Sequence, residues 1–176
     1  NDNEILDKTN EIKNNRSNYL AKQNEAEQAA SASIINNIST SNINELVIES
    51  LTPYLIHVDL NAQKTYIYNG NLKNWNLEKT FTCSTGIKGE ETPQGIYTVK
   101  EKGQWFFSEQ YNQGGKYWVQ FLGDYLFHSL PYNKEKTNIV DYTLGTPASH
   151  GCIRLKDEDS KWIYDNIPKG TKVIIK

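Results

Sequence analysis

The feature that most constrains this chain is a change of composition near residue 50. The first 50 residues contain no glycine, proline or tryptophan, whereas all eleven glycines, all five prolines and all four tryptophans come after them. Glycine and proline break helices and punctuate β structure, so their absence favours helix and their frequent occurrence favours short strands joined by turns. The sequence therefore predicts a helical stalk or linker over residues 1–50 and a β-rich domain over residues 51–176.

The N-terminal part favours helix but offers little apolar surface for packing. Residues 21–32 have high helix propensity, and a thin apolar stripe falls near one side of a helix. We expect a helix over residues 4–35 that acts as a spacer or stalk, and then a second short helix or a docking segment over residues 43–51. The stripe consists of Ile5, Leu6, Ile12, Tyr19 and Leu20.

After residue 53 the pattern is that of β structure. Apolar or alternating segments are separated by turn residues, which predicts a mainly β fold of the sandwich or barrel type. One late helix is expected over residues 158–166, with Asp157 as its N-cap and Pro168 and Gly170 after its end. The predicted strands cover residues 54–60, 64–68, 75–84, 95–101, 105–109, 116–122, 125–129, 150–155 and 171–175.

A single thiol, Cys152, follows a histidine and a glycine at the start of a short apolar segment. If a strand covers residues 150–155, His150 and Cys152 point to the same face of it. An imidazolium beside a thiol favours the thiolate, which is the nucleophilic form. Gly151 permits close approach of a substrate, and the backbone N–H groups of Gly151 and Cys152 are candidate donors to an oxyanion. These features together predict a reactive cysteine.

Three segments carry a resemblance to a known family. Ser149-His150-Gly151-Cys152 continues as Ile153-Arg154-Leu155, and upstream of it lie Phe127-His128-Ser129 and, earlier, Ser84-Thr85-Gly86 with Thr92-Pro93-Gln94-Gly95-Ile96-Tyr97. In this order they resemble the L,D-transpeptidase catalytic domain (YkuD) family, whose members are cysteine enzymes that cross-link peptidoglycan. The resemblance covers about residues 55–176. Twenty residues separate His128 from Ser149, more than is common in the family, so we expect an enlarged loop around residues 133–146.

The resemblance assigns roles to the thiol and to one histidine. It implies Cys152 as the nucleophile and His128 as the base, with the far ring nitrogen of His128 held by a backbone carbonyl near Ser129. His150 is the competing base because it is closest to the thiol in sequence. If it is not the base, we expect it to position the cysteine loop or to contact the substrate directly.

Other residues of the motif are expected to support the site. Arg154 falls on the same strand face as Cys152 in a regular strand, where it would hold a substrate carboxylate or fix a backbone carbonyl; the alternative is a surface arginine. Ser149 and Gly151 would shape the loop. The resemblance also implies a lid formed by the aromatic-rich hairpin, with substrate contacts from Tyr111, Tyr117 or Trp118.

The remaining cysteine and histidine are expected to be structural. Cys83 and Cys152 could form one disulfide or remain two free thiols, but a nucleophilic Cys152 must be reduced, so we interpret Cys83 as a core residue. His57 lies in the first predicted strand and is interpreted as a structural or surface histidine. A zinc site is not expected, because structural zinc ligands normally come in paired spacings.

The resemblance implies a specific reaction without cofactor or metal. Cys152 would form a thioester with a tetrapeptide stem, release D-Ala and pass the acyl group to the side-chain amine of another stem, which gives a 3-3 cross-link. Carbapenem β-lactams would be covalent inhibitors. The alternatives are an L,D-carboxypeptidase, in which water accepts the acyl group, and a cell-wall-binding module without turnover.

Charge and hydropathy restrict the partners. The net charge is −2 and basic residues are scattered, which argues against binding to nucleic acid. No apolar run approaches the ~20 residues of a membrane span, and no signal peptide is recognisable. We expect an extracytoplasmic protein of the cell wall or cell surface, with membrane contact only through an upstream anchor or export segment.

Overall fold

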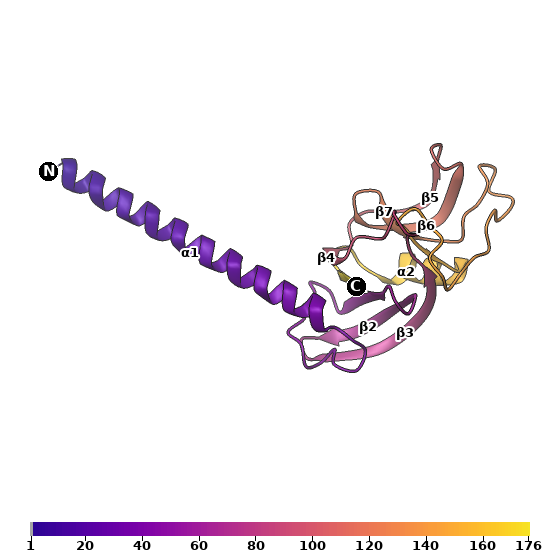
Figure 1. Ribbon diagram of the computed structural model, residues 1–176, viewed down its shortest axis with the longest axis horizontal. Coiled ribbons are helices and arrows are strands. Elements are labelled where there is room, and N and C mark those ends of the chain that lie inside the picture. Colours follow the sequence, from indigo (N-terminus) through magenta and orange to yellow (C-terminus); the bar gives the residue numbers. More distant parts are fainter. Residues whose placement is uncertain (1) are drawn as a thin grey trace. The chain divides into compact units, whose positions relative to one another are not determined.

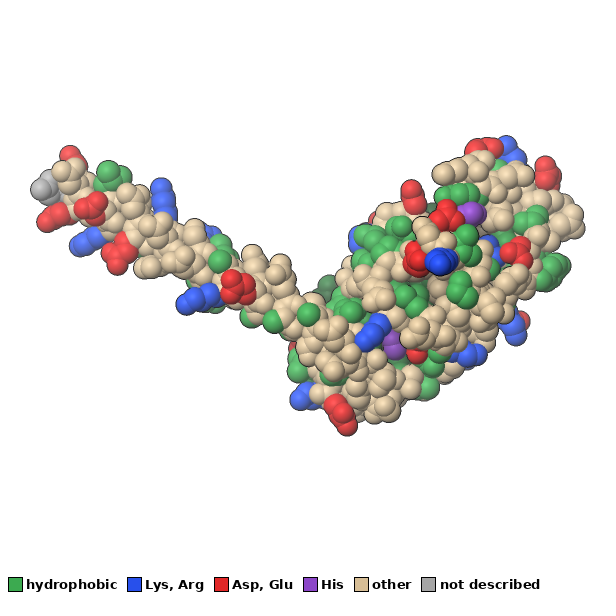
Figure 2. All heavy atoms as spheres, viewed as in Figure 1, with side chains coloured by type: hydrophobic (Ala, Val, Ile, Leu, Met, Phe, Trp, Pro, Cys, Tyr) green, Lys and Arg blue, Asp and Glu red, His purple; other side chains and the backbone are tan. Residues whose placement is uncertain are grey.

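The computed structural model describes residues 2–176, so residue 1 of the predicted stalk lies outside the described residues. Contacts divide the chain into two compact units, Asn1–Asn37 and Ile38–Lys176. The first consists of helix α1 (Asp2–Asn37), which is slightly longer than predicted. Figure 2 shows acidic and basic side chains distributed along the helix, and the five residues of its apolar stripe are exposed.

The segment after α1 belongs to the second unit and packs as the predicted docking segment. Residues 40–46 form turns instead of a second helix. The side chains of Ile43 and Ile48 are buried, and the Asn44 amide exchanges two hydrogen bonds with the backbone of Trp75. The indole N–H of Trp75 donates to the carbonyl oxygen of Ile48 (3.0 Å). The second unit thus starts at Ile38, earlier than the expected domain start at residue 51.

This packing predicts where the chain can be shortened. A chain that begins at Ile38 should unfold cooperatively at nearly the temperature of the full chain. A chain that begins at Thr52 should be much less stable, because it loses the three buried isoleucines Ile38, Ile43 and Ile48, each worth about 1.5–3 kcal/mol. Thermal unfolding followed by circular dichroism measures both. Equal midpoints for the two shortened chains would contradict the packing role of residues 38–51.

Nine strands of the described chain form one sheet, in the order β4-β9-β1-β2-β3-β8-β7-β6-β5. The β1–β9 and β7–β8 pairs are parallel and the others are antiparallel. The strands are β1 (Tyr54–Asp59), β2 (Lys64–Asn71), β3 (Asn74–Ser84), β4 (Gly95–Thr98), β5 (Lys102–Ser108), β6 (Gln113–Leu122), β7 (Tyr125–His128), β8 (Ile153–Leu155) and β9 (Lys172–Ile175).

Strand β3 joins the two halves of the sheet. It pairs with β2 over residues 74–82, and only Cys83 and Ser84 pair with β8. Figure 1 shows β3 as a long, strongly bent strand, so the sheet curls into a half-barrel. This confirms the predicted mainly β fold with one late helix, and all predicted strands are present with shifted ends.

Helix α2 (Asp157–Asn166) packs on the apolar interior of the half-barrel. Ile163 lies in the buried core, and the Trp162 ring contacts Phe81 edge-on with 6.0 Å between ring centroids. The predicted N-cap is wrong by one position, because Lys156 is the N-cap and makes no side-chain capping bond. Asp157 is the first helical residue, and its carboxylate instead accepts a hydrogen bond from the Tyr132 hydroxyl.

Candidate active site

Cys152 lies immediately before β8, in a tight turn and not within the strand. The predicted strand over residues 150–155 is wrong in its first half, because β8 begins at Ile153. Gly151 has φ of 127°, a conformation that favours glycine. His150 and Cys152 are therefore not two positions apart on an extended strand, and the expectation that strand geometry holds them side by side does not apply.

Hydrogen bonds fix this turn from both sides. The Ser149 hydroxyl donates to the carbonyl oxygen of Cys152 (2.6 Å) and accepts from the Gly151 N–H (3.1 Å). The Thr92 hydroxyl donates to the carbonyl oxygen of Gly151 (2.7 Å). A Cβ at Gly151 would lie 2.5 Å from the Tyr125 ring, so only glycine fits. Because Ser149 engages the Gly151 N–H, the Cys152 N–H remains the candidate oxyanion donor.

His128 ends β7, and its ring is held in one tautomer. Its Nδ1 lies 2.6 Å from the carbonyl oxygen of Ser129. A carbonyl oxygen can only accept, so Nδ1 carries the proton and Nε2 has a free lone pair when the ring is neutral. The Ser129 hydroxyl accepts from the Lys116 N–H (2.8 Å) and donates to the carbonyl oxygen of Leu130 (2.8 Å), which fixes the backbone that orients the ring.

The strand beside His128 leaves room for the ring. A Cβ at Gly115 of β6 would lie 2.7 Å from the His128 Nδ1, so glycine is needed at this close approach. On another side the Phe106 ring meets the imidazole edge-on, with 5.0 Å between centroids. The histidine is therefore buried and packed in one orientation.

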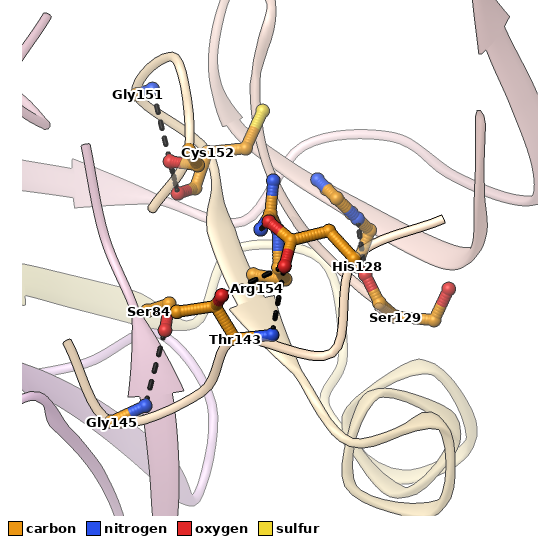
Figure 3. A network of polar contacts seen from close by, with 10 residues as sticks. Ser84, His128, Ser129, Thr143, Gly145, Gly151, Cys152 and Arg154 are labelled. Atoms are coloured by element: carbon orange, nitrogen blue, oxygen red, sulfur yellow. Dashed lines mark hydrogen bonds and ion pairs between the residues drawn. The ribbon is translucent and has the colours of Figure 1, made fainter. Parts of the chain in front are cut away.

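One cavity brings the thiol and the imidazole together. Cys152, His128, Ser149, His150 and Arg154 all line a cavity of about 370 Å³. Figure 3 shows the Cys152 thiol, in the turn before β8, and the His128 ring at the end of β7, and both residues line this cavity. The thiol donates a long hydrogen bond to the carbonyl oxygen of Asp124 (3.4 Å).

Burial favours the neutral form of both groups. It raises the pKa of the Cys152 thiol to about 11, although a hydrogen bond with the Leu126 backbone and the charge of Arg154 act in the opposite direction. Burial lowers the pKa of His128 to about 4, although the hydrogen bond to the Ser129 backbone acts to raise it. Burial thus favours a neutral thiol and a neutral imidazole over the thiolate stabilised by an imidazolium that the sequence predicts.

Arg154 is buried and paired, so it is not a surface arginine. It stands beside His128 in the β7–β8 pairing, and its Nη1 donates to Asp141 Oδ2 at 2.8 Å. Asp141 belongs to the enlarged loop between β7 and β8, where it also accepts two hydrogen bonds from Thr143 that lower its pKa. Asp141 was not predicted as a partner of Arg154, and the unusual length of this loop was the only signal for it in the sequence.

His150 points to a different set of partners from His128. Its Nδ1 lies 2.7 Å from Glu90 Oε2, and its ring stacks on Tyr111 with 3.7 Å between centroids and an 8° angle between planes. Tyr111 lies in the turn between β5 and β6. His150 therefore fits the expected positioning role, because it ties this hairpin turn to the cysteine loop.

The stacking predicts a local effect of removing His150. His150→Ala should increase hydrogen–deuterium exchange in residues 108–113, because it removes the ring on which Tyr111 rests. Tyr111→Phe retains a stacking ring and should leave this exchange unchanged. Exchange followed by mass spectrometry measures both variants. Unchanged exchange in His150→Ala would show that the hairpin is held by other contacts.

The two remaining candidates are structural. Cys83 is a free, fully buried thiol in the core, and burial raises its pKa to about 11. His57 is buried in β1 and contacts Tyr66, with 5.8 Å between ring centroids, and burial lowers its pKa to about 4.

Among residues 2–176 no cluster of three or more His, Cys, Asp and Glu side chains could hold a metal ion. In the same range, no helix combines the length and apolar character needed to cross a membrane.

Comparisons with known proteins identify the family of this chain. The sequence model of the L,D-transpeptidase catalytic domain family (YkuD) matches residues 53–175. A curated protein of Bacillus subtilis (strain 168) named as the L,D-transpeptidase YciB is 45% identical over 128 residues, which cover 68% of this chain and 64% of the relative.

Two solved structures share the fold. One is a fused Zn-dependent amidase/peptidase/peptidoglycan-binding domain-containing protein from Clostridium acetobutylicum ATCC 824, with a TM-score of 0.66 and 36% identity over 87% of this chain and 62% of that chain. The other is the transpeptidase LdtMt1 in complex with imipenem, with a TM-score of 0.58 and 17% identity. The match covers 70% of this chain and 59% of that chain. The chain spans a little under two thirds of the length of these relatives. Because the family match extends over most of the chain, this chain belongs to the family of L,D-transpeptidase catalytic domains.

Proposed function

We propose that this chain is the catalytic domain of a peptidoglycan L,D-transpeptidase that uses Cys152 as its nucleophile. The observation that carries the proposal is the presence in one cavity of a half-buried thiol and a histidine whose Nε2 is free to accept a proton. Membership of the family supports the reaction class. The substrate follows from the family and is a tetrapeptide stem of peptidoglycan.

In the first step Nε2 of His128 takes the thiol proton as the sulfur attacks the stem carbonyl. The oxyanion that forms is stabilised by the backbone N–H of Cys152. The leaving D-Ala amine takes the proton from His128, the C–N bond breaks and a thioester remains. This sequence starts from the neutral pair favoured by burial and needs no metal or cofactor.

In the second step an amine of another stem attacks the thioester. His128 takes a proton from the amine and returns it to the departing sulfur, and a 3-3 cross-link results. A second cavity, of about 450 Å³, also reaches Cys152 and adjoins the first, with Trp118 and Leu126 as additional lining residues. This further space at the thiol supports transfer between two peptides, whereas hydrolysis in an L,D-carboxypeptidase requires room for only one.

The proposed substrate also sets the place of action. A domain that cross-links stems must meet them outside the cytoplasm, so we propose an extracytoplasmic location at the cell wall or cell surface. Retention there by an upstream anchor or export segment is part of the same proposal. Carbapenems are proposed inhibitors, supported by the imipenem complex of LdtMt1.

Two measurements test this function. The full chain incubated with imipenem should gain the mass of one covalent adduct, located at Cys152 by peptide mapping. Incubation with a tetrapeptide stem should release D-Ala, and addition of an amine acceptor should divert the product from tripeptide to cross-linked dimer. If only tripeptide forms at a saturating concentration of the acceptor, the chain is an L,D-carboxypeptidase. If neither the imipenem adduct nor the release of D-Ala is observed, the chain is a binding module without turnover.

A further inference from the structure

A separate cavity of about 440 Å³ also borders the β5–β6 hairpin. Neither Cys152 nor His128 lines it. Trp105 of β5 lines this cavity, whereas its neighbour Phe106 lines the catalytic one. Its walls consist chiefly of three aromatic rings and three lysines: Trp105, Tyr117, Tyr164, Lys116, Lys136 and Lys161.

The backbone is strained at one of these rings. Tyr117 lies within β6 with φ of 54°, a conformation that is unfavourable for a bulky residue. In a regular strand Lys116 and Tyr117 would point to opposite faces. The left-handed backbone allows both to line one cavity, where the Tyr117 ring lies 5.8 Å from that of Tyr164. Strain that places a side chain in a cavity is typical of binding sites.

The charge of the cavity is positive. Lys161 is paired with Asp165 (2.6 Å), the carboxylate that also lines the cavity. Among the described residues neither Lys116 nor Lys136 forms an ion pair with a carboxylate. Their ammonium groups lie over aromatic rings, Lys136 at 4.8 Å from the centroid of Trp105 and Lys116 at 4.2 Å from that of Tyr132. Two ammonium groups are thus held in place and available to an anion.

We propose that this cavity binds a carboxylate-bearing saccharide unit. Aromatic rings stack against the apolar C–H faces of pyranose rings, the Gln104 amide can bond to hydroxyl groups, and the lysines attract the acid group. For the source of the saccharide the proposal rests on the proposed function, because a muramyl unit of the glycan exposes a free lactyl carboxylate where its stem has been removed. A second glycan contact would hold the polymer against the domain while stems enter and leave the catalytic cavity.

Titrations of the full chain followed by NMR test the chemistry of the ligand. The acidic disaccharide N-acetylglucosaminyl-N-acetylmuramic acid should shift resonances of residues 104–105 and 116–117. Neutral di-N-acetylchitobiose should bind at least about threefold more weakly, because it lacks the carboxylate. Equal affinity for the two disaccharides, or tighter binding of glycerol phosphate than of the acidic disaccharide, would overturn the proposal.

Matched variants test the location. Trp105→Ala should weaken binding of the acidic disaccharide about tenfold. Lys136→Gln should weaken binding of the acidic disaccharide about threefold and reduce the salt dependence of this binding. Lys134→Gln is the matched control, because Lys134 lies in the same loop but pairs with Glu109 outside the cavity. This control variant should bind the disaccharide as the unchanged chain does. Equal affinities for the two lysine variants would place the ligand elsewhere.

Acylation by imipenem separates this proposal from the proposed function. Lys136→Gln should be acylated at the rate of the unchanged chain, because Lys136 does not line the catalytic cavity. Intact acylation without saccharide binding would overturn only the second site. Saccharide binding at these residues without acylation or turnover would overturn only the proposed reaction.

Discussion

Cys152→Ala is expected to abolish both the imipenem adduct and the release of D-Ala, while the chain still unfolds cooperatively. The substitution removes the only thiol that lines the catalytic cavity of the described chain. It leaves the turn intact, because the bonds around it are made by backbone groups and by the Ser149 and Thr92 hydroxyls. Intact mass after incubation, with thermal unfolding on the same sample, measures both outcomes.

Cys83→Ala is the matched control. Cys83 is the other free thiol, but it is fully buried in the core and its pKa is raised to about 11. Removing its sulfur should lower the unfolding temperature, because a small cavity remains, and should leave acylation essentially unchanged. Loss of acylation in both variants, with both folded, would point to a functional pair of cysteines instead of a single nucleophile.

His128→Ala is expected to lower the rate of acylation by roughly 10²- to 10⁴-fold, the usual contribution of a general base. His128 has an oriented ring with a free Nε2, whereas His150 is held by Glu90 and Tyr111. His150→Ala should therefore change the rate less than about tenfold. Stopped-flow acylation by imipenem measures the rates, and a larger loss in His150→Ala would exchange the two assignments.

The pH dependence distinguishes a neutral pair from an ion pair. With a thiol pKa of about 11 and a His128 pKa of about 4, both groups are neutral between these values. Simple alkylation by iodoacetamide should rise about tenfold per pH unit near neutrality, because only the thiolate reacts. Acylation assisted by His128 should stay nearly constant from about pH 5 to about pH 9 and fall as the imidazole is protonated in acid. Fast alkylation that does not vary with pH near neutrality would show that a thiolate–imidazolium pair is the resting state.

The fold could be predicted well because its signals are local. The absence of glycine and proline before residue 50 marked the helix, and turn residues at short intervals marked the strands that form the half-barrel. The docking of residues 38–51 was less evident, because it depends on hydrogen bonds of Asn44 and Ile48 with the distant Trp75. The composition changes only near residue 50, whereas contacts divide the chain after Asn37.

The candidate cysteine, the two histidines that compete as its base and the family could be identified from the amino-acid sequence, because they depend on motif residues at fixed spacing along the chain. The remaining features of the site became evident in the folded chain. The structure showed that Cys152 precedes its strand, that Asp141 pairs with Arg154, and that His150 belongs with Glu90 and Tyr111. It also showed that burial lowers the pKa of His128 and raises that of Cys152. The physical reason is that burial and ion pairing arise from groups that are distant in sequence, such as Glu90 and His150, and a pattern along the chain does not contain them.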